Sequence, residues 1–449
     1  MFVAQALLFR RTKLKPTVLL ATTARWFPTA RLAMALASAG FRVEAVCPSA
    51  HPLTKTGVAK TTYRYRGLRP LSSFANAIAA AKPNLIVPGD DLATFHLHQL
   101  YQREREHRRN GDLRPLIERS LGAPESFPIV FQRAAFLELA QDLNIRSPRT
   151  EVVADSADLR SWAASVGFPI ALKADGTSGG DGVKIAFNLE EAESALRALA
   201  APPLLVRAVK RTLVDQDDTL LRPSLLRRRS IVNAQAFVAG REATSAIACW
   251  KGVVIGSLHF EVVKKAQAHG HATVVRVIEN QEMSIAAERL VQRLHLSGLH
   301  GLDFMLEGKT GKAHLIEINP RSTQVGHLTL GLGHDLPAAL YSAVSGRPVT
   351  PVRKITEKET IALFPHEWIR DETSPFLRSG YHDVPWQNPE LVRACVLSRR
   401  KQHAWYAPKA SLKSTPPVEL LPPDLIAPEL DPDDLVAKGS QYQRSELRS

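Results

Sequence analysis

Short apolar runs alternate with helical segments in the first part of the chain, and this alternation limits the fold more than any other feature. A short apolar run with no helical period is typical of a buried parallel strand. The elements expected in chain order are a strand at Thr17–Ala21, a helix at Ala30–Ala39 that ends at Gly40, a strand at Phe41–Val46, a helix at Leu71–Ala81 and a strand at Asn84–Pro88. We therefore expect residues 1–125 to form a small doubly wound α/β domain that binds ligands at the carboxyl ends of its strands.

Two acidic residues follow the last of these strands, in the sequence Gly89-Asp90-Asp91. Because they stand at the carboxyl end of a strand, they could line a substrate cleft. The commoner explanation of such a pattern is an acidic cap at the start of a helix. Both interpretations stay open on the sequence alone.

The order of elements changes between residues 126 and 346. A helix is expected at Arg133–Gln141, and Ser147-Pro148 marks a break after it. Strands are then expected at Thr150–Val153, Phe168–Ala174, Val183–Phe187, Leu204–Ala208, Ile231–Val238, Thr244–Trp250, Val253–Phe260, Leu302–Glu307 and Ala313–Ile318, with helices at Leu189–Ala200 and Met283–Leu294. Adjacent strands interrupted by helices indicate α+β layers instead of a second doubly wound sheet. Residues 347–407 contain several tryptophans and are expected to pack as a small unit, whereas the proline-rich residues 408–449 are expected to be a mobile or extended tail.

Composition narrows the class of protein. The 449 residues carry a formal net charge of +14, which raises the question of nucleic acid. The arginine-rich runs at Arg103–Arg114 and Arg222–Arg229 lack the interleaved aromatic residues that stack on bases, so we favour solvated surface or an anionic substrate. No apolar run reaches the length of a membrane span, and basic residues follow the apolar run Met1–Phe9, the reverse of a secretory signal. With three widely spaced cysteines, these features predict a cytoplasmic protein without a membrane partner.

A glycine-rich loop follows a strand that ends in lysine. The segment runs from Lys173 through Gly176 to Gly182, and its neighbouring glycines include Gly179 and Gly180. Such a loop can lay backbone N–H groups against phosphates while the lysine supplies the opposite charge. Taken alone, this pattern is more often a plain hairpin or a flexible loop.

Carboxylates embedded in apolar strands form the second chemical feature. Asp303 stands between Leu302 and Phe304, and Glu317 and Asn319 alternate with isoleucines before Arg321. Side chains two apart in a strand share a face, and a hairpin turning at Gly308–Gly311 would bring Asp303 opposite Glu317. Two carboxylates and an amide oxygen suit Mg²⁺. The alternative is that Glu317 and Arg321 form a surface ion pair. An unpaired carboxylate among apolar residues is costly, which favours a metal site or a satisfied charged network.

A third segment, Ala234–Glu242, reads locally as a strand, a glycine turn and a second strand. Together with the two features above, in this order, it resembles the ATP-grasp superfamily, which includes biotin carboxylase, carbamoyl phosphate synthase and D-alanine–D-alanine ligase. The resemblance covers about residues 127–346. It implies a pre-ATP-grasp Rossmann-like domain at 1–125, a two-lobed ATP-grasp domain at 126–346, a small C-terminal unit at 347–407 and a tail at 408–449.

The resemblance assigns a role to each matching residue. Lys173 would contact the α and β phosphates, and Arg133 occupies the position of a second lysine of the family. Arg321 would steady the acyl phosphate and the transition state. The other matching residues are Gly179, Gly180 and Gly182 in the loop over the triphosphate, Gln235, Ala236, Phe237 and Val238 in the hinge that holds the adenine, Glu242 at the ribose, and Asp303, Glu317 and Asn319 as magnesium ligands.

The function implied is an ATP- and Mg²⁺-dependent ligase, with Mn²⁺ as a substitute metal. It would activate a small-molecule carboxylate as an acyl phosphate and couple it to an amine or a thiol. The alternatives are a phosphotransferase of the same fold and a non-catalytic nucleotide-binding regulatory protein. A homodimer is one candidate assembly. The basic segment 209–229 is read as solvated surface, ahead of an anionic-substrate loop or a subunit contact, and His327 is the histidine most suited to a substrate site.

Overall fold

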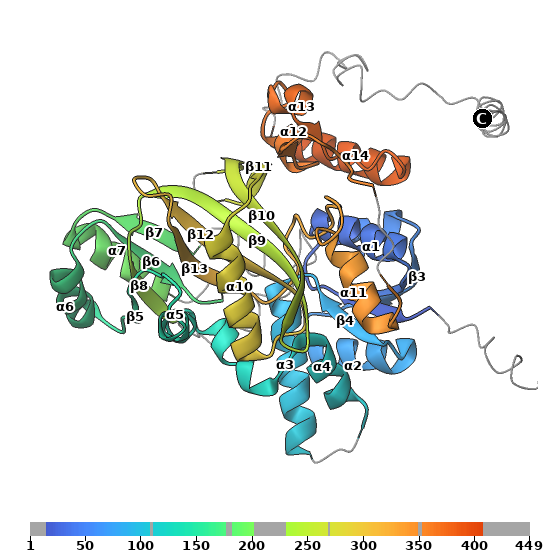
Figure 1. Cartoon of the computed structure of the whole chain (residues 1–449), viewed down its shortest axis with the longest axis horizontal. Coiled ribbons are helices and arrows are strands. Elements are labelled where there is room, and N and C mark those ends of the chain that lie inside the picture. The colour runs from blue at the N-terminus through green and yellow to red at the C-terminus, as the bar shows by residue number, and fades with distance from the viewer. Residues whose placement is uncertain are drawn as a thin grey trace, which may run out of the picture. The chain divides into compact units, whose positions relative to one another are not determined.

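The computed structural model describes residues 15–107, 111–176, 182–201, 230–267, 270–348 and 353–406 (Figure 1). The chain divides into two units, Met1–Cys395 and Val396–Ser449. Several predictions lie outside the described residues: Gly179, Gly180, the strand at Leu204–Ala208, the basic segment 209–229 and the tail 408–449. Within the part of the chain that the structure describes, no helix is long and apolar enough to cross a membrane.

A four-stranded parallel sheet in the order β3-β2-β1-β4 opens the chain. Its strands are β1 (Thr17–Ala21), β2 (Arg42–Cys47), β3 (Ala59–Arg64) and β4 (Leu85–Pro88). Its helices are α1 (Phe27–Ala39), α2 (Pro70–Ala81), α3 (Asp91–Glu106) and α4 (Leu113–Leu121), with the 3-10 helix η1 (Pro52–Lys55). The parallel α/β arrangement is confirmed. Gly40 ends α1 with a φ of 113°, a left-handed conformation that glycine adopts without strain.

A four-stranded antiparallel sheet in the order β5-β8-β6-β7 follows. Its strands are β5 (Thr150–Val152), β6 (Ile170–Ala174), β7 (Val183–Ala186) and β8 (Val232–Ala236). Before and beside them lie η2 (Pro124–Ser126), η3 (Ile129–Phe131), α5 (Arg133–Asp142), α6 (Ser156–Val166) and α7 (Leu189–Ala200). Apolar side chains of α6, α7, β6 and β8 share one core, including the fully buried Leu159, Leu172 and Ala192. This small layer forms because each helix buries one apolar stripe against one face of the sheet.

The largest sheet has seven strands in the order β13-β12-β9-β10-β11-β14-β15. The strands are β9 (Gly240–Trp250), β10 (Val253–Lys265), β11 (Ala272–Val277), β12 (Gly298–Glu307), β13 (Ala313–Asn319), β14 (Thr360–Ala362) and β15 (Tyr381–His382). The remaining helices are α10 (Gln281–Leu294), α11 (Leu336–Ser345), α12 (His366–Arg370), α13 (Phe376–Ser379) and α14 (Pro389–Tyr406). Buried residues of α5, α10 and the strands β9, β12 and β13 form a common core. The expected α+β layers are confirmed.

The C-terminal segment contributes to this large sheet. Strand β14 pairs antiparallel with β11 through Val275 and Ile361, and β15 pairs parallel with β14. The segment that we expected to pack as a small unit at 347–407 therefore extends the edge of the sheet in the 126–346 part. We retain the boundaries near residues 125 and 346 as a proposal.

Candidate active site

The two antiparallel sheets are joined by a short connection between β8 and β9. Gln235 and Ala236 are the last residues of β8, and Phe237 and Val238 lie in the connection before β9 begins at Gly240. Gln235 is buried, and its side chain donates a hydrogen bond to Thr150 Oγ1 at 3.0 Å. These positions suit a hinge between two lobes, because a few residues between sheets can absorb a change of angle.

Strands β12 and β13 bring the two predicted carboxylates together. Asp303 and Glu317 are direct partners across the antiparallel pair, as the hairpin hypothesis predicted. Asp303 accepts a hydrogen bond from Thr244 Oγ1 of β9 at 2.8 Å and another from the Asn319 amide at 2.8 Å. The alternative of a surface ion pair between Glu317 and Arg321 is wrong, because Glu317 pairs with Arg133 and Arg321 pairs with Asp91.

Arg133 crosses from the start of α5 to both antiparallel sheets. Its Nη2 lies 2.6 Å from Glu317 Oε2 on β13, and its Nη1 lies 3.1 Å from Asp175 Oδ1 just after β6. Asn233 on β8 donates a second hydrogen bond to Asp175 at 2.9 Å. The sequence interpretation missed Asp175 and Asn233. A signal existed for each: Asp175 follows Lys173 with the two-residue period of a strand, and Asn233 is a polar residue inside an apolar run.

Lys173 is the last but one residue of β6 and is 8% exposed. Burial lowers the pKa of its amine to about 8, because desolvation disfavours the charged form, while the nearby Glu317 carboxylate opposes this effect. The Lys173 ammonium also lies within the electrostatic reach of Asp303 and Glu242. A cation of this kind can receive an anionic ligand without first shedding a full hydration shell.

The neighbouring carboxylates differ in their affinity for protons. Burial and, to a smaller extent, the Glu317 charge raise the pKa of Asp303 to about 6, against the hydrogen bonds from Thr244 and Asn319. Burial acts in the same direction on Glu317, but the charges of Arg133 and Lys173 hold the pKa of Glu317 below its ordinary value. Two adjacent buried carboxylates of this kind are stabilised by a cation placed between them.

Arg321 follows β13 and is held at several points. Its Nε lies 3.1 Å from Asp91 Oδ2, and its Nη2 donates to Asn319 Oδ1 at 3.1 Å. The guanidinium carbon lies 5.2 Å from the centre of the Trp26 ring, a cation–π distance. Asp91 belongs to the pair read as a cleft wall or a helix cap. The helix-cap interpretation is confirmed, because Asp90 caps α3. Asp91 lines a cavity at this place, and its part in a substrate cleft stays a prediction.

Glu242 lies at the other end of the hinge, on β9. Its Oε1 is 2.6 Å from Lys265 Nζ of β10, and 42% of its side chain is exposed. A carboxylate that is partly exposed next to the hinge can accept hydrogen bonds from hydroxyl groups of a ligand. Gly182 precedes β7 across from Ala174, and its carbonyl accepts a hydrogen bond from the Ala174 N–H at 2.9 Å.

A cavity of about 70 Å³ marks the meeting point of these groups. Its lining includes Asp91 at the start of α3, Arg133 at the start of α5, Asp175 just after β6, and Glu317 and Asn319 on β13. The cavity therefore joins side chains from four separate parts of the chain. Residues predicted from distant parts of the sequence come together at this point.

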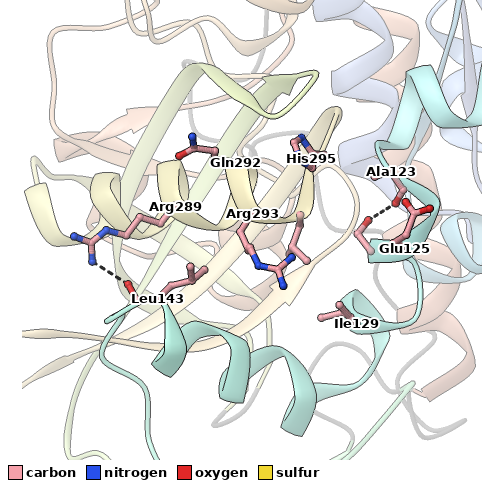
Figure 2. A pocket seen from close by; sticks show the side chains of 10 residues that line it. Ala123, Glu125, Ile129, Leu143, Arg289, Gln292, Arg293 and His295 are labelled. Carbon is pink, nitrogen blue, oxygen red and sulfur yellow. Dashed lines mark hydrogen bonds between the residues drawn. The ribbon is translucent and has the colours of Figure 1, made fainter.

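A larger cavity of about 610 Å³ lies elsewhere, between α10 and the segment that leads into α5 (Figure 2). Its lining includes Ile129, Leu143, Arg289 and Arg293. The Arg289 guanidinium donates to the Leu143 carbonyl at 3.0 Å and so satisfies the C-terminal end of α5 (Figure 2). None of the residues predicted from the sequence lines this cavity. We therefore place the candidate active site at the smaller one, which is lined by Arg133, Asp175, Glu317 and Asn319.

The residues at β12 and β13 suit a magnesium ion by their chemistry. Asp303, Glu317 and Asn319 offer the hard oxygen atoms that Mg²⁺ prefers. The Asn319 amide nitrogen faces Asp303 and its oxygen faces Arg321; a half-turn of the amide would present the oxygen to the carboxylates. Across the described ranges, no cluster of three or more His, Cys, Asp or Glu side chains is arranged to hold a metal. Two carboxylates and an amide leave positions for water and ligand oxygens, as is usual for Mg²⁺.

Comparisons with known proteins bear on the fold. A family model described as an ATP-grasp domain matches residues 215–325. In the biotin carboxylase domain of Hydrogenobacter thermophilus 2-oxoglutarate carboxylase, 74% of this chain matches 70% of that chain, with a TM-score of 0.53 and 14% identity. In N5-carboxyaminoimidazole synthetase of Staphylococcus aureus, solved with ADP, 75% of this chain matches 80% of that chain, with a TM-score of 0.52 and 14% identity. The chain has the ATP-grasp fold.

Curated relatives extend the likeness to sequence. The carbamoyl phosphate synthase large chain of Archaeoglobus fulgidus is 24% identical over 275 residues, which are 60% of this chain and 23% of that protein. The corresponding large chain of Thermus thermophilus is 24% identical over 222 residues, which are 49% of this chain and 19% of that protein. The match therefore spans less than a quarter of the length of either relative.

The ATP-grasp family model includes part of the predicted site. Asp303, Glu317, Asn319 and Arg321 fall inside the matched residues 215–325, whereas Lys173 and the earlier residues fall outside them. The histidine that we singled out, His327, lies after the match. Its Nε2 is 2.7 Å from Asp383 Oδ2, and both side chains are buried, so this ring nitrogen already has a partner within the protein.

Proposed function

We propose that this protein is an ATP- and Mg²⁺-dependent ligase. It activates a small-molecule carboxylate as an acyl phosphate and couples it to an amine, with a thiol as the second choice of nucleophile. The observation that carries the proposal is the convergence of Arg133, Asp175, Glu317 and Asn319 on one cavity, with Asp303 and Arg321 bonded to Asn319. Such a set combines cations for a triphosphate with hard oxygen atoms for a metal, in the cleft of an ATP-grasp fold.

The residues of the chain would divide the work by their charge. Lys173 and Arg133 would neutralise phosphate oxygens from the small-sheet side. Glu242 and the hinge residues Gln235 to Val238 would hold the nucleoside. Asp303, Glu317 and Asn319 would hold Mg²⁺, which offsets charge on the phosphates when it is bound. Arg321 would stabilise the anionic oxygen atoms of the acyl phosphate.

The proposed reaction has two transfers. A carboxylate oxygen attacks the γ-phosphorus of ATP, and the bond to ADP breaks. The amine nitrogen then attacks the acyl carbon, the carbon–oxygen bond to phosphate breaks, and the amine loses a proton. Positioning and charge neutralisation account for most of the rate in such reactions.

The test is ADP and phosphate release from purified protein with Mg²⁺ and ATP, screened against pooled carboxylates with pooled amines. We expect release that requires both pools. Glu317→Ala should lower it by at least roughly 100-fold, because it removes a carboxylate that would hold Mg²⁺, and losing one group that stabilises the transition-state charge costs on the order of 10²–10³ in rate. Glu390→Gln changes an exposed carboxylate and is the matched control, with unchanged release expected.

The outcomes separate the alternatives. ADP release that needs only one acceptor would replace the ligase proposal by a phosphotransferase. ATP binding without turnover against any pool would replace it by a nucleotide-binding regulatory protein. Equal release from the wild type and Glu317→Ala would contradict the role of the carboxylate pair.

A further inference from the structure

The carboxyl edge of the first sheet contacts the segment Asn319–Ser322 at several points. The Thr94 hydroxyl donates to the Pro320 carbonyl at 2.7 Å, and the Ser322 N–H approaches the Pro88 carbonyl at 3.4 Å. Between these two contacts, Arg321 reaches Asp91. The segment that carries the arginine is therefore bound along its length by residues that precede it by more than two hundred positions.

The loops of this edge are themselves fixed. Asp90 Oδ2 accepts hydrogen bonds from the Thr22 hydroxyl and the Thr23 N–H, each at 2.6 Å, and Asp90 Oδ1 accepts from the Thr23 hydroxyl at 2.8 Å. The same oxygen caps α3 through the Ala93 N–H at 2.8 Å. Asp90 thus joins the loop after β1 to the start of α3. Trp26 follows that loop and Asp91 begins that helix, so the bonds of Asp90 restrain the backbone near both residues.

The contacts of Arg321 leave a defined part of its guanidinium available. Asp91 occupies the Nε–H at 3.1 Å, the Ser322 carbonyl accepts from Nη1 at 3.2 Å, and Asn319 accepts from Nη2 at 3.1 Å. A guanidinium has five N–H donors, so these contacts leave one on each terminal nitrogen for a ligand. Three hydrogen bonds to a planar group, together with a ring against its face, fix the direction in which the remaining donors point.

We propose that Asp91 is a positioning residue for Arg321. A carboxylate at the start of α3, beside the first sheet, would thus fix the orientation of the active-site arginine. This inference rests on the proposed ligase function. With Asp91 in place, the Nε side of the guanidinium is fixed, and the two unused terminal donors keep one direction next to Asn319. Without the carboxylate, the guanidinium turns about its last side-chain bonds, and an error of about 1 Å at a reacting group can cost on the order of 100-fold in rate.

The same contact could instead serve only to hold two parts of the chain together. Thr94 distinguishes these roles, because it bridges the same two segments yet touches the Pro320 backbone and not the guanidinium. Thr94→Val removes this bridge with little change in volume. A tie that is purely structural would make Thr94→Val and Asp91→Asn equivalent in kinetics once both are compared below their unfolding temperatures.

The experiment compares Asp91→Asn, Asp91→Glu and Thr94→Val with the wild type, using the carboxylate and amine pools that give the highest turnover. We expect Asp91→Asn to lower kcat by roughly 10- to 100-fold with KM for ATP changed less than about twofold. Asp91→Glu should restore part of kcat, and Thr94→Val should leave kcat within about twofold. Equal kcat losses in Asp91→Asn and Thr94→Val, or a loss confined to KM for ATP, would overturn the proposal.

A second readout does not need turnover. Phenylglyoxal reacts with unpaired arginine side chains, and mass spectrometry measures its rate at Arg321. We expect Asp91→Asn to raise that rate several-fold and Thr94→Val to leave it unchanged. Identical rates in all variants would overturn the positioning role even if the ligase function is established. A raised rate in Asp91→Asn without turnover against any pool would contradict the ligase function and still support the positioning of Arg321 by Asp91.

Discussion

Lys173 carries a positive charge on a side chain that is largely buried, so water solvates this charge poorly. Its pKa falls to about 8 from an ordinary 10.5, chiefly because burial disfavours the ammonium form. The acids around it recover only part of that free energy. A buried charge that weakens the fold is typical of a functional position, since a ligand of opposite charge can repay the loss on binding.

Replacing this lysine should therefore strengthen the fold and weaken ligand binding. For Lys173→Met at pH 7 we expect the free energy of unfolding to rise by about 1–3 kcal/mol, since one pKa unit corresponds to about 1.4 kcal/mol. Affinity for ATP should fall at least roughly tenfold. Denaturant unfolding and calorimetric titration measure the two effects, with the exposed Lys184→Met on the next strand as the control.

The pH dependence of that difference has a definite sign. Below about pH 8 the amine is protonated in both the folded and the unfolded chain, so the advantage of Lys173→Met is constant. Between about pH 8 and 10.5 the unfolded chain binds the extra proton, so the wild type gains stability relative to the variant as pH rises. An advantage that grows across this range would contradict the assigned cause.

Among the elements, strand β9 begins directly after the hinge, and its first residue, Gly240, packs closely against β12. A Cβ on Gly240 would lie 2.0 Å from the Leu306 carbonyl oxygen, a backbone atom that cannot turn aside. Glycine is required at this position by the close approach of two strands. The connection from β8 can therefore bend only before Gly240, where Phe237 and Val238 lie.

Gly240→Ala should consequently disrupt the pairing of β9 with β12. We expect a loss of roughly 2–4 kcal/mol in the free energy of unfolding, at the upper end of typical single substitutions. Gly308 is the matched control, because a Cβ there would lie 3.7 Å from the Ala239 carbonyl oxygen, an ordinary contact. Equal stability of the two variants in urea would contradict the close approach.

Elements with a clear period were predictable, and elements defined by their neighbours were not. The hairpin of β12 and β13 followed from alternating side chains and a glycine turn, and so did the pairing of Asp303 with Glu317. Strand β3 escaped prediction because most of its residues are exposed and polar. Strand β11 was missed although its run Ala272–Val277 is rich in valine and threonine, which is the signal that could have identified it.

At the scale of the whole first unit, a buried charged cluster joins three distant segments. Asp383, after β15, forms ion pairs with Arg31 of α1 and with His327 after β13. Like the contact of Asp91 with Arg321, this cluster could not be predicted from the sequence, because pairs of opposite charge hundreds of residues apart carry no local pattern. Burial opposes ionisation of Asp383, but Arg31 and His327 hold the pKa of its carboxyl below the ordinary value.

Removing this carboxylate should weaken the unit as a whole. For Asp383→Asn at pH 7 we expect a loss of about 3–5 kcal/mol, because a buried arginine is left without its partner. A depressed carboxyl pKa stabilises the fold above the unfolded pKa and ceases to do so as pH falls through the folded pKa. The difference from wild type should therefore shrink below about pH 4. Urea unfolding at pH 7 and below about pH 4 measures the stability difference between the variant and the wild type. The same difference at both pH values would contradict the ion-pair explanation.

The short strands β14 and β15 also set an order for protein synthesis. Strand β14 covers the hydrogen-bonding edge of β11, and β15 pairs with β14, yet the ribosome makes both more than eighty residues after β11. Until β14 has emerged, a nascent chain presents the open edge of β11, and open edges recruit strands from other chains. The two short strands thus act late in biogenesis as a cover for the sheet.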